Sequence, residues 1–216
     1  MQKREGREWG VKTIVKNTLS LTAITLVMGI LLGAVHYVTA RPIAVQEQKK
    51  VEEAYREVFP EADHFEEQDM GGLSDRLSRA LSDGGHEEEQ IDAVAQALDG
   101  DGALLGYVLT VTTSQGYGGD IQLTMGVAED GTTEGISFLS IEETAGLGMR
   151  ADTEEFRSQF SGKRTDSFAY TKTGASGENE IDALSGATVT TNAVTSAVNA
   201  GLTAFQALNE EGGETE

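Results

Sequence analysis

The sequence predicts an α+β protein in which a single N-terminal transmembrane helix is followed by a domain with a curved antiparallel sheet flanked by helices. Three observations predict this class. Residues 17–40 form an uncharged apolar run, apolar and polar side chains alternate from Leu104 onward, and apolar residues near the C-terminus recur every three or four positions. The 216 residues suffice for one domain with a hydrophobic core plus accessory segments.

The apolar run predicts a single membrane-spanning helix, because its 24 residues from Asn17 to Ala40 include no Asp, Glu, Lys or Arg. At ~1.5 Å per residue, such a helix reaches about 36 Å and can cross a hydrocarbon core of roughly 30 Å. The basic residues before it are Lys3, Arg4, Arg7, Lys12 and Lys16. By the positive-inside rule, residues 1–16 are expected in the cytoplasm and the C-terminal domain outside the cell (inner) membrane.

A cleaved signal peptide is the alternative interpretation of the same segment. Val38-Thr39-Ala40 offers small residues at suitable cleavage positions. The apolar region of a signal peptide is usually about 7 to 15 residues long, which favours retention of this longer run as an anchor.

Residues 41–102 are expected to form a stalk and the helical, acidic N-terminal part of the outer domain. Apolar side chains between Ile43 and Phe59 are spaced to form one helical stripe. Residues 60–102 are acidic, with two Gly-Gly pairs, and a helix is expected near Glu87–Leu98.

Residues 103–208 are expected to form the main domain. Its strands are indicated by alternation at Leu105, Tyr107, Leu109 and Val111, then at Ile121, Leu123, Met125 and Val127, and at Ile136 and Phe138 after a turn at Asp130-Gly131. A short helix over residues 152–161, a strand over 167–173 and a final helix running through Phe205 complete the domain. The polar tail, residues 209–216, is expected to be disordered.

The charge pattern excludes nucleic acid as a partner. The formal net charge is −20, whereas a phosphate backbone requires a clustered Lys/Arg surface. Residues 1–50 hold 8 Lys/Arg and 3 Asp/Glu, which leaves 8 of the 16 basic and 33 of the 36 acidic residues for positions 51–216. The two parts of the chain are therefore expected to face different surroundings.

The residue inventory also limits the redox chemistry. The chain has no cysteine, which rules out disulfides, Cys-ligated iron–sulfur clusters and thiolate catalysis. Its 3 histidines lack any spacing typical of a metal site, and no metal is expected. If the protein handles electrons, it needs an organic cofactor.

A phosphate site is indicated at Asp182-Ala183-Leu184-Ser185-Gly186-Ala187-Thr188, directly before the final helix. A Gly-containing turn that opens a helix leaves backbone N–H groups unpaired and presents the positive end of the helix dipole. The structural alternative is that Ser185, Thr188, Thr190 or Thr191 simply caps the helix.

A second candidate segment is the loop Glu143-Thr144-Ala145-Gly146-Leu147-Gly148. Its glycines allow the backbone to approach a flat ring closely, and Glu143 and Thr144 can hydrogen-bond the polar edge of such a ring. Taken alone, the hexapeptide is equally compatible with an ordinary glycine-rich loop.

These two segments, in this order, resemble the FMN-binding domain of RnfG, a component of the Rnf complex, and of NqrC in the sodium-pumping quinone reductase. The resemblance covers roughly residues 103–203 plus the N-terminal anchor. It implies one covalent FMN per chain, carried by Thr188 through a phosphoester bond. Ser185, Gly186 and Ala187 would line the phosphate, and Asp182 would serve recognition or the attachment reaction.

The resemblance further places the Glu143, Thr144, Gly146, Leu147 and Gly148 loop against the flavin ring. The Gly116–Ile121 segment and the Lys172 region also match the family. Two departures concern the loop: Ala145 replaces the usual Pro, and Ile141 stands where the family often has His.

By the same resemblance, the chain is an electron-carrying subunit, rather than an enzyme by itself, of an Rnf complex that moves electrons between ferredoxin and NAD while translocating Na⁺ or H⁺. Its partners would be the other Rnf subunits and an ApbE-type flavin transferase, which uses FAD outside the cytoplasmic membrane. The short chain favours the Rnf subunit over NqrC. Two further alternatives are a free-standing extracytoplasmic flavin reductase and a non-redox binding module on a stalk.

Overall fold

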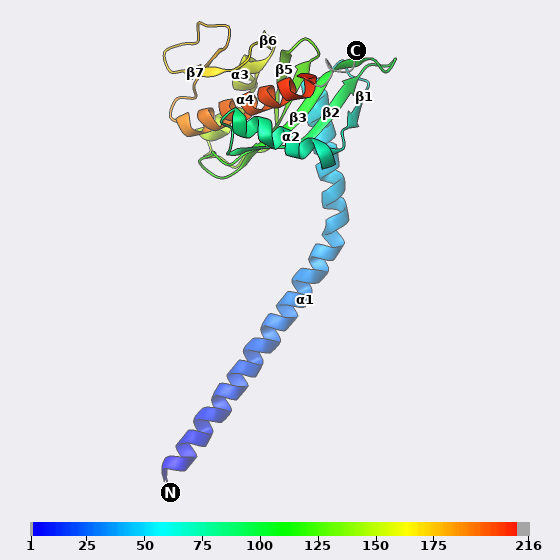
Figure 1. Cartoon of the computed structure of the whole chain (residues 1–216). Coiled ribbons are helices and arrows are strands. Elements are labelled where there is room, and N and C mark those ends of the chain that lie inside the picture. Colours follow the sequence, from blue (N-terminus) through cyan, green and yellow to red (C-terminus); the bar gives the residue numbers. More distant parts are fainter. Residues whose placement is uncertain (1, 211–216) are drawn as a thin grey trace. The chain divides into compact units, whose positions relative to one another are not determined.

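The computed structural model describes residues 2–210, and it describes side chains from Lys12 onward except at positions 40–42, 44 and 210 (Figure 1). The chain divides into two compact units, Met1–Lys49 and Lys50–Glu216. Of the polar tail expected over residues 209–216, positions 211–216 lie outside the described residues. Asn209 and Glu210 belong to the final helix, so the expectation of disorder was wrong for these two residues.

The first unit consists of most of helix α1 (Gln2–Val58). Within α1, the 28-residue stretch Lys12–Thr39 contains an 18-residue window of mean hydropathy 2.1 and is long and apolar enough to cross a membrane, although a signal sequence passes the same test. The hydroxyls of Thr25 and Thr39 donate to carbonyls three and four residues earlier. Threonines are compatible with this apolar helix because their polar groups are satisfied within it.

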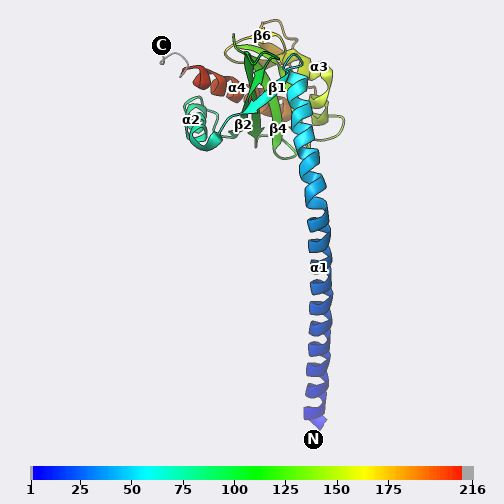
Figure 2. The same cartoon turned by 90° about the vertical axis from the view of Figure 1, so that its right-hand side faces the viewer.

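The second unit is built on a six-stranded antiparallel sheet of order β1-β2-β3-β4-β5-β6. Figure 2 labels β1, β2, β4 and β6 of this sheet. Its strands are β1 (His64–Glu67), β2 (Glu89–Leu98), β3 (Leu104–Thr113), β4 (Ile121–Ala128), β5 (Thr132–Ser140) and β6 (Lys163–Arg164). A separate parallel pair joins β7 (Ala169–Thr171) to β8 (Glu180–Asp182). The predicted antiparallel sheet with flanking helices is confirmed.

Helices cover both faces of this sheet. Helices α2 (Met70–Asp83) and α4 (Thr188–Glu210) bury Leu77, Val194 and their neighbours in the main core. The last turns of α1 pack Tyr55, Val58 and Phe59 against Ala95, Ala97 and Val108 in a second cluster. A Cβ on Gly106 of β3 would lie 2.7 Å from the Phe59 ring, so the absence of a side chain permits this contact.

The helix expected near Glu87–Leu98 was wrong, because this segment forms β2. The apolar residues Ile91, Val94 and Leu98 are also compatible with helical spacing, and a register shift between Ile91 and Ala93 interrupts the alternation typical of a strand. Hydrogen bonding to β1 on one side and β3 on the other decides the conformation. The helix in this region, α2, begins instead after Asp69, whose side chain accepts a hydrogen bond from the Gly71 N–H at 3.0 Å.

The smaller elements after β5 match the expected order in shortened form. The helical region comprises η1 (Gly148–Asp152), α3 (Glu154–Arg157) and η2 (Ser158–Phe160), and the strand expected over 167–173 is reduced to β7. Phe160 makes edge-to-face contacts with Phe156 and Phe168, with ring centroids 5.7 and 5.2 Å apart. These three buried rings fix the segment between the two candidate motifs.

Candidate functional site

A cleft of about 540 Å³ lies where the β3–β4 loop, the loop after β5 and the first turn of α4 meet. Its volume is in the range of small-molecule and cofactor sites. It is lined by Tyr117, Glu143, Thr144, Leu147, Gly148, Gly186, Ala187, Thr188, Val189 and Thr190. The two candidate segments, some forty residues apart in sequence, therefore form two walls of one cavity.

The wall that contains Thr188 is a tight turn leading into α4. The Ala187 N–H donates to the Leu184 carbonyl at 3.0 Å, and Gly186 has a φ of 80°, the pattern of a type II turn. A glycine at this position adopts the positive φ without steric cost. The turn directs the chain into the 23-residue helix α4, which begins at Thr188 beside the cleft.

The start of α4 makes this wall favourable for an anion. The first N–H groups of a helix have no partner within the helix, and the dipole places partial positive charge there. Leu184 and Ala187 are buried in the main core, whereas Ser185 and Gly186 are exposed and Thr188 is partly exposed. Thr188 is thus a partly exposed residue of the cleft at the positive end of the helix.

The other wall is held in shape by its own hydrogen bonds. Glu143 Oε1 accepts from the backbone N–H groups of Tyr117 and Gly118, at 2.7 and 3.4 Å. The Thr144 carbonyl accepts from the N–H groups of Leu147 and Met149, at 3.1 and 3.2 Å. Glu143 therefore ties the β3–β4 loop to this wall with one of its carboxylate oxygens.

Gly148 is the point at which the two walls touch. A Cβ on Gly148 would lie 2.6 Å from Thr190 Oγ1 and 2.7 Å from both Cβ and Oε2 of Glu143. Such distances are too short for any side chain, so the close approach of this loop to α4 requires glycine at position 148.

The rim of the cleft is apolar and exposed. Tyr117 is 74% exposed, Val189 50% and Leu147 44%, and they are the large apolar side chains classed as exposed among the described residues of the second unit. Exposed apolar groups gathered at a cavity are typical of a ligand or partner site.

The structure places the sequence-predicted residues in two groups. Those that line the cleft are Glu143, Thr144, Leu147, Gly148, Gly186, Ala187 and Thr188. Those outside its lining are Gly146, Lys172, Asp182 and Ser185. Gly146 has a φ of 75° and shapes the loop through its backbone.

Asp182 is the last residue of β8, and Lys172 lies in the loop between β7 and β8. Asp182 Oδ1 accepts from the Ala175 N–H at 2.7 Å. Glu180 Oε2 accepts from the N–H groups of Ser176 and Gly177, and these bonds lower the pKa of the Glu180 carboxyl. The two carboxylates therefore order the segment after β7, near the Leu184–Ala187 turn.

Three residues that line the cleft were not among the site residues predicted from the sequence: Tyr117, Val189 and Thr190. Tyr117 lies in the Gly-Tyr-Gly-Gly segment, where an aromatic residue between glycines was an available signal. Thr190 was weighed as a helix cap and as an alternative attachment position, and the structure shows it 1% exposed. Val189 carried no signal, because one apolar residue in a helix is ordinary.

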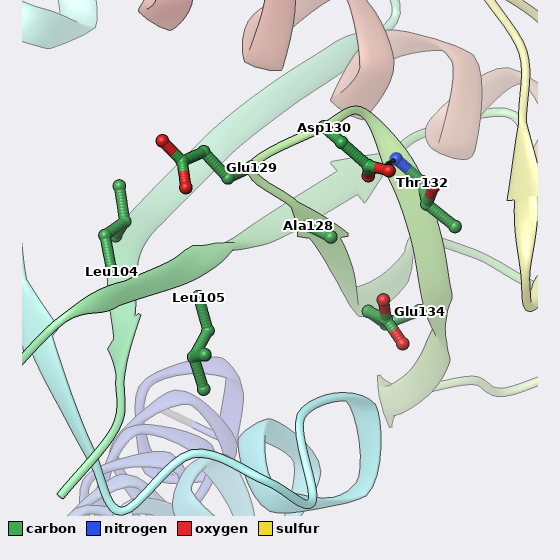
Figure 3. A pocket seen from close by; sticks show the side chains of 7 residues that line it. All are labelled: Leu104, Leu105, Ala128, Glu129, Asp130, Thr132 and Glu134. Atoms are coloured by element: carbon green, nitrogen blue, oxygen red, sulfur yellow. Dashed lines mark hydrogen bonds between the residues drawn. The ribbon is translucent and has the colours of Figure 1, made fainter.

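A second cleft, of about 650 Å³, lies at the opposite end of the same strands (Figure 3). Three of its lining residues are acidic, namely Glu129, Asp130 and Glu134. Burial raises the pKa of Glu134, and the charges of Glu61 and Asp130 add to this effect. Three acidic lining residues make this cleft less suited to a phosphate than the cleft at the start of α4, where the helix dipole favours negative charge.

Two family models match the chain. The FMN-binding domain matches residues 116–203, which include both walls of the first cleft. The RnfG N-terminal region matches residues 1–58, the extent of α1. Fold and site thus define an FMN-binding domain that follows a helix able to span a membrane.

Relatives extend the similarity over almost the whole chain. The G subunit of the Na(+)-translocating ferredoxin:NAD(+) oxidoreductase complex of Acetobacterium woodii is 30% identical over 97% of this chain and 100% of its own length. The corresponding subunit of the proton-translocating ferredoxin:NAD(+) oxidoreductase complex of Clostridium ljungdahlii is 32% identical over 84% of this chain and 85% of its own. The chain therefore belongs to the RnfG family of ion-translocating oxidoreductase complexes.

A crystal structure of NqrC from Shewanella oneidensis is also similar, with 23% identity and a TM-score of 0.48 over 55% of this chain and 59% of that one.

The apolar helix of α1, together with the ion-translocating complexes of the relatives, marks the chain as a membrane protein.

Proposed function

We propose that this chain is an electron-carrying subunit of an Rnf-type ferredoxin:NAD oxidoreductase complex and holds one FMN covalently on Thr188. The observation that carries the proposal is the position of Thr188, a partly exposed residue at the start of a 23-residue helix that lines a cleft with an apolar rim. Bound FMN would supply a centre that accepts and releases electrons one or two at a time.

The residues of the chain would divide the work of binding. The turn residues Ser185, Gly186 and Ala187 and the first N–H groups of α4 would hold the phosphate, where the helix dipole favours negative charge. Tyr117, Leu147 and Val189 would cover the flavin ring and exclude water from it. The Glu143–Gly148 loop would set the position of the ring.

Attachment would require a flavin transferase of the ApbE type with FAD as donor. The bond that forms joins Thr188 Oγ to the phosphorus of the FMN half of FAD, and the pyrophosphate bond that breaks releases AMP. The hydroxyl proton is lost in the same reaction. Asp182, which lies next to the turn but outside the cleft, would contribute to recognition by the transferase.

The membrane arrangement follows from the charges around α1. Residues 1–16 would lie in the cytoplasm, residues 17–40 would span the membrane once, and residues 41–102 and the FMN-binding domain, residues 103–208, would lie outside the cytoplasm. This orientation would expose Thr188 to a transferase outside the cytoplasmic membrane.

This orientation predicts the reactivity of an introduced cysteine. The chain has no cysteine, and Ser82 is an exposed residue of α2. In intact cells, Ser82→Cys should react with a membrane-impermeant maleimide, whereas Gln2→Cys should react only after the membrane is permeabilised. The opposite pattern of labelling would reverse the orientation.

The carrier function predicts that the isolated subunit turns over poorly. The full chain, flavinylated and purified in detergent, should give negligible steady-state turnover with NADH or reduced ferredoxin and a soluble acceptor. Membranes that contain the whole complex should reduce NAD with ferredoxin. Rapid multiple turnover by the isolated chain would instead establish a free-standing flavin reductase, and absence of flavin after coexpression with an active transferase would favour a binding module.

A further inference from the structure

The hydroxyl of Thr191 connects the two ends of the attachment turn. Thr191 Oγ1 accepts from the Leu184 N–H at 3.1 Å and donates to the Ala187 carbonyl at 3.0 Å. The Thr191 N–H donates to the same Ala187 carbonyl at 3.0 Å. One oxygen atom therefore joins the first and last residues of the turn to the helix that follows.

The Thr191 oxygen adds to the contacts that orient the turn toward the helix, which include the burial of Leu184 and Ala187 in the main core and the bond from the Thr191 N–H to the Ala187 carbonyl. The internal bond of the turn, from the Ala187 N–H to the Leu184 carbonyl, fixes its curvature. Gly186, at a positive φ, has the backbone freedom to act as a pivot. Leu184 is 6% exposed, so its N–H has little access to water as a substitute partner.

The same geometry separates three hydroxyls that lie within four residues. Thr191 is fully buried, with its hydroxyl engaged as both donor and acceptor, and Thr190 is 1% exposed. Thr188 is partly exposed and lines the cleft. Burial and hydrogen bonding keep the Thr191 hydroxyl from reacting, whereas Thr188 remains at the cleft.

We propose that Thr191 is a positioning residue for flavin attachment: its hydroxyl locks the Leu184–Ala187 turn onto α4, so that Thr188 Oγ is held in the orientation from which it attacks FAD. This inference rests on the proposed attachment at Thr188. Thr191 takes no part in the bond that forms or in the bond that breaks.

The test compares two variants that differ in a single side-chain atom at position 191. Thr191→Ser and Thr191→Cys both remove the methyl group, and they differ only in having oxygen or sulfur at the γ position; sulfur is a poor hydrogen-bond acceptor. The unflavinylated full chain in detergent is incubated with the transferase and FAD, and the initial rate of labelling is measured by intact mass. Thr191→Ser should label within about twofold of the wild-type rate, since the oxygen is retained.

Thr191→Cys should label about tenfold or more slowly at saturating FAD, because a small misplacement of a reacting group is costly. The KM for FAD should be unchanged, because FAD binds the transferase. Thr195→Val is the matched control: this buried hydroxyl, one turn later in α4, donates to the Thr191 carbonyl at 2.8 Å and does not contact the turn. This variant should label at the wild-type rate.

Wild-type labelling of Thr191→Cys, in a chain whose wild-type form is labelled at Thr188, would overturn the positioning function alone. Absence of labelling in the wild-type chain would defeat both the attachment and the inference. If Thr191→Cys does not fold, residue-resolved hydrogen exchange on the unmodified chain decides the question. The Leu184 amide should exchange at least about tenfold more slowly than that of exposed Ser185, and equal rates would contradict the lock.

Discussion

Thr188→Val is expected to abolish covalent flavin while leaving the domain folded. Coexpressed with its transferase, the wild-type chain should give a yellow-green fluorescent band in a denaturing gel and an added mass of one FMN minus one water. The variant should lose both signals completely, because no oxygen remains to form the ester. Its stability should fall by only about 1 kcal/mol, since the hydroxyl of one partly exposed residue at a helix start contributes little.

Thr190→Val is the control for this result. Thr190 is two residues away and of the same type, but it is 1% exposed. The fluorescence and the added mass should survive this change. If they survive Thr188→Val and disappear in Thr190→Val, the attachment site moves to Thr190.

Gly148→Ala is expected to lower electron transfer by on the order of a hundredfold without releasing the flavin, since even ~1 Å of displacement can have such an effect. The added Cβ would lie 2.6 Å from Thr190 Oγ1 and 2.7 Å from Glu143 Cβ, so the loop after β5 must move away from α4. Crowding of this kind typically lowers stability by about 1 to 3 kcal/mol. The fluorescent band should remain, because the ester lies on the other wall.

The readout is ferredoxin-dependent NAD reduction by membranes, normalised to the fluorescence of the band. Gly146→Ala is the matched control in the same loop. A Cβ there meets nothing within 4 Å, and the cost of about 1 to 2 kcal/mol would come only from the φ of 75°. Electron transfer should fall much less in Gly146→Ala than in Gly148→Ala, and an equal or larger loss would show that the backbone, rather than the contact with Thr190, positions the ring.

The elements that sequence reasoning predicted well are those decided by local patterns. The apolar stretch in α1 is recognised by length and composition, because a membrane solvent imposes both. Strands β3, β4 and β5 follow from alternation over eight to ten residues each, and α4 from its apolar spacing. Each candidate motif is a short run of consecutive residues. Its residues could therefore be recognised in the sequence before their positions in the structure were known.

Prediction from the sequence failed where contacts between distant parts of the chain decide the local structure. In β2, residues Glu89–Leu98 have a composition compatible with a helix, and the hydrogen bonds that make them a strand come from β1 and β3. The position of Tyr117 at the cleft depends on the Glu143 carboxylate, 26 residues further along the chain. No pattern local to either segment contains this information.

The sequence by itself determined the apolar helix able to span a membrane, the class of domain and the pair of segments proposed to bind flavin, because each is specified by neighbouring residues. Only the tertiary structure decided which members of those segments share a cleft. It left Asp182 outside that cleft, brought Gly148 against Thr190, and assigned the Thr191 hydroxyl to the turn. The physical reason is that cavities and close contacts arise from the packing of loops onto a sheet and a helix, which depends on residues far apart in sequence.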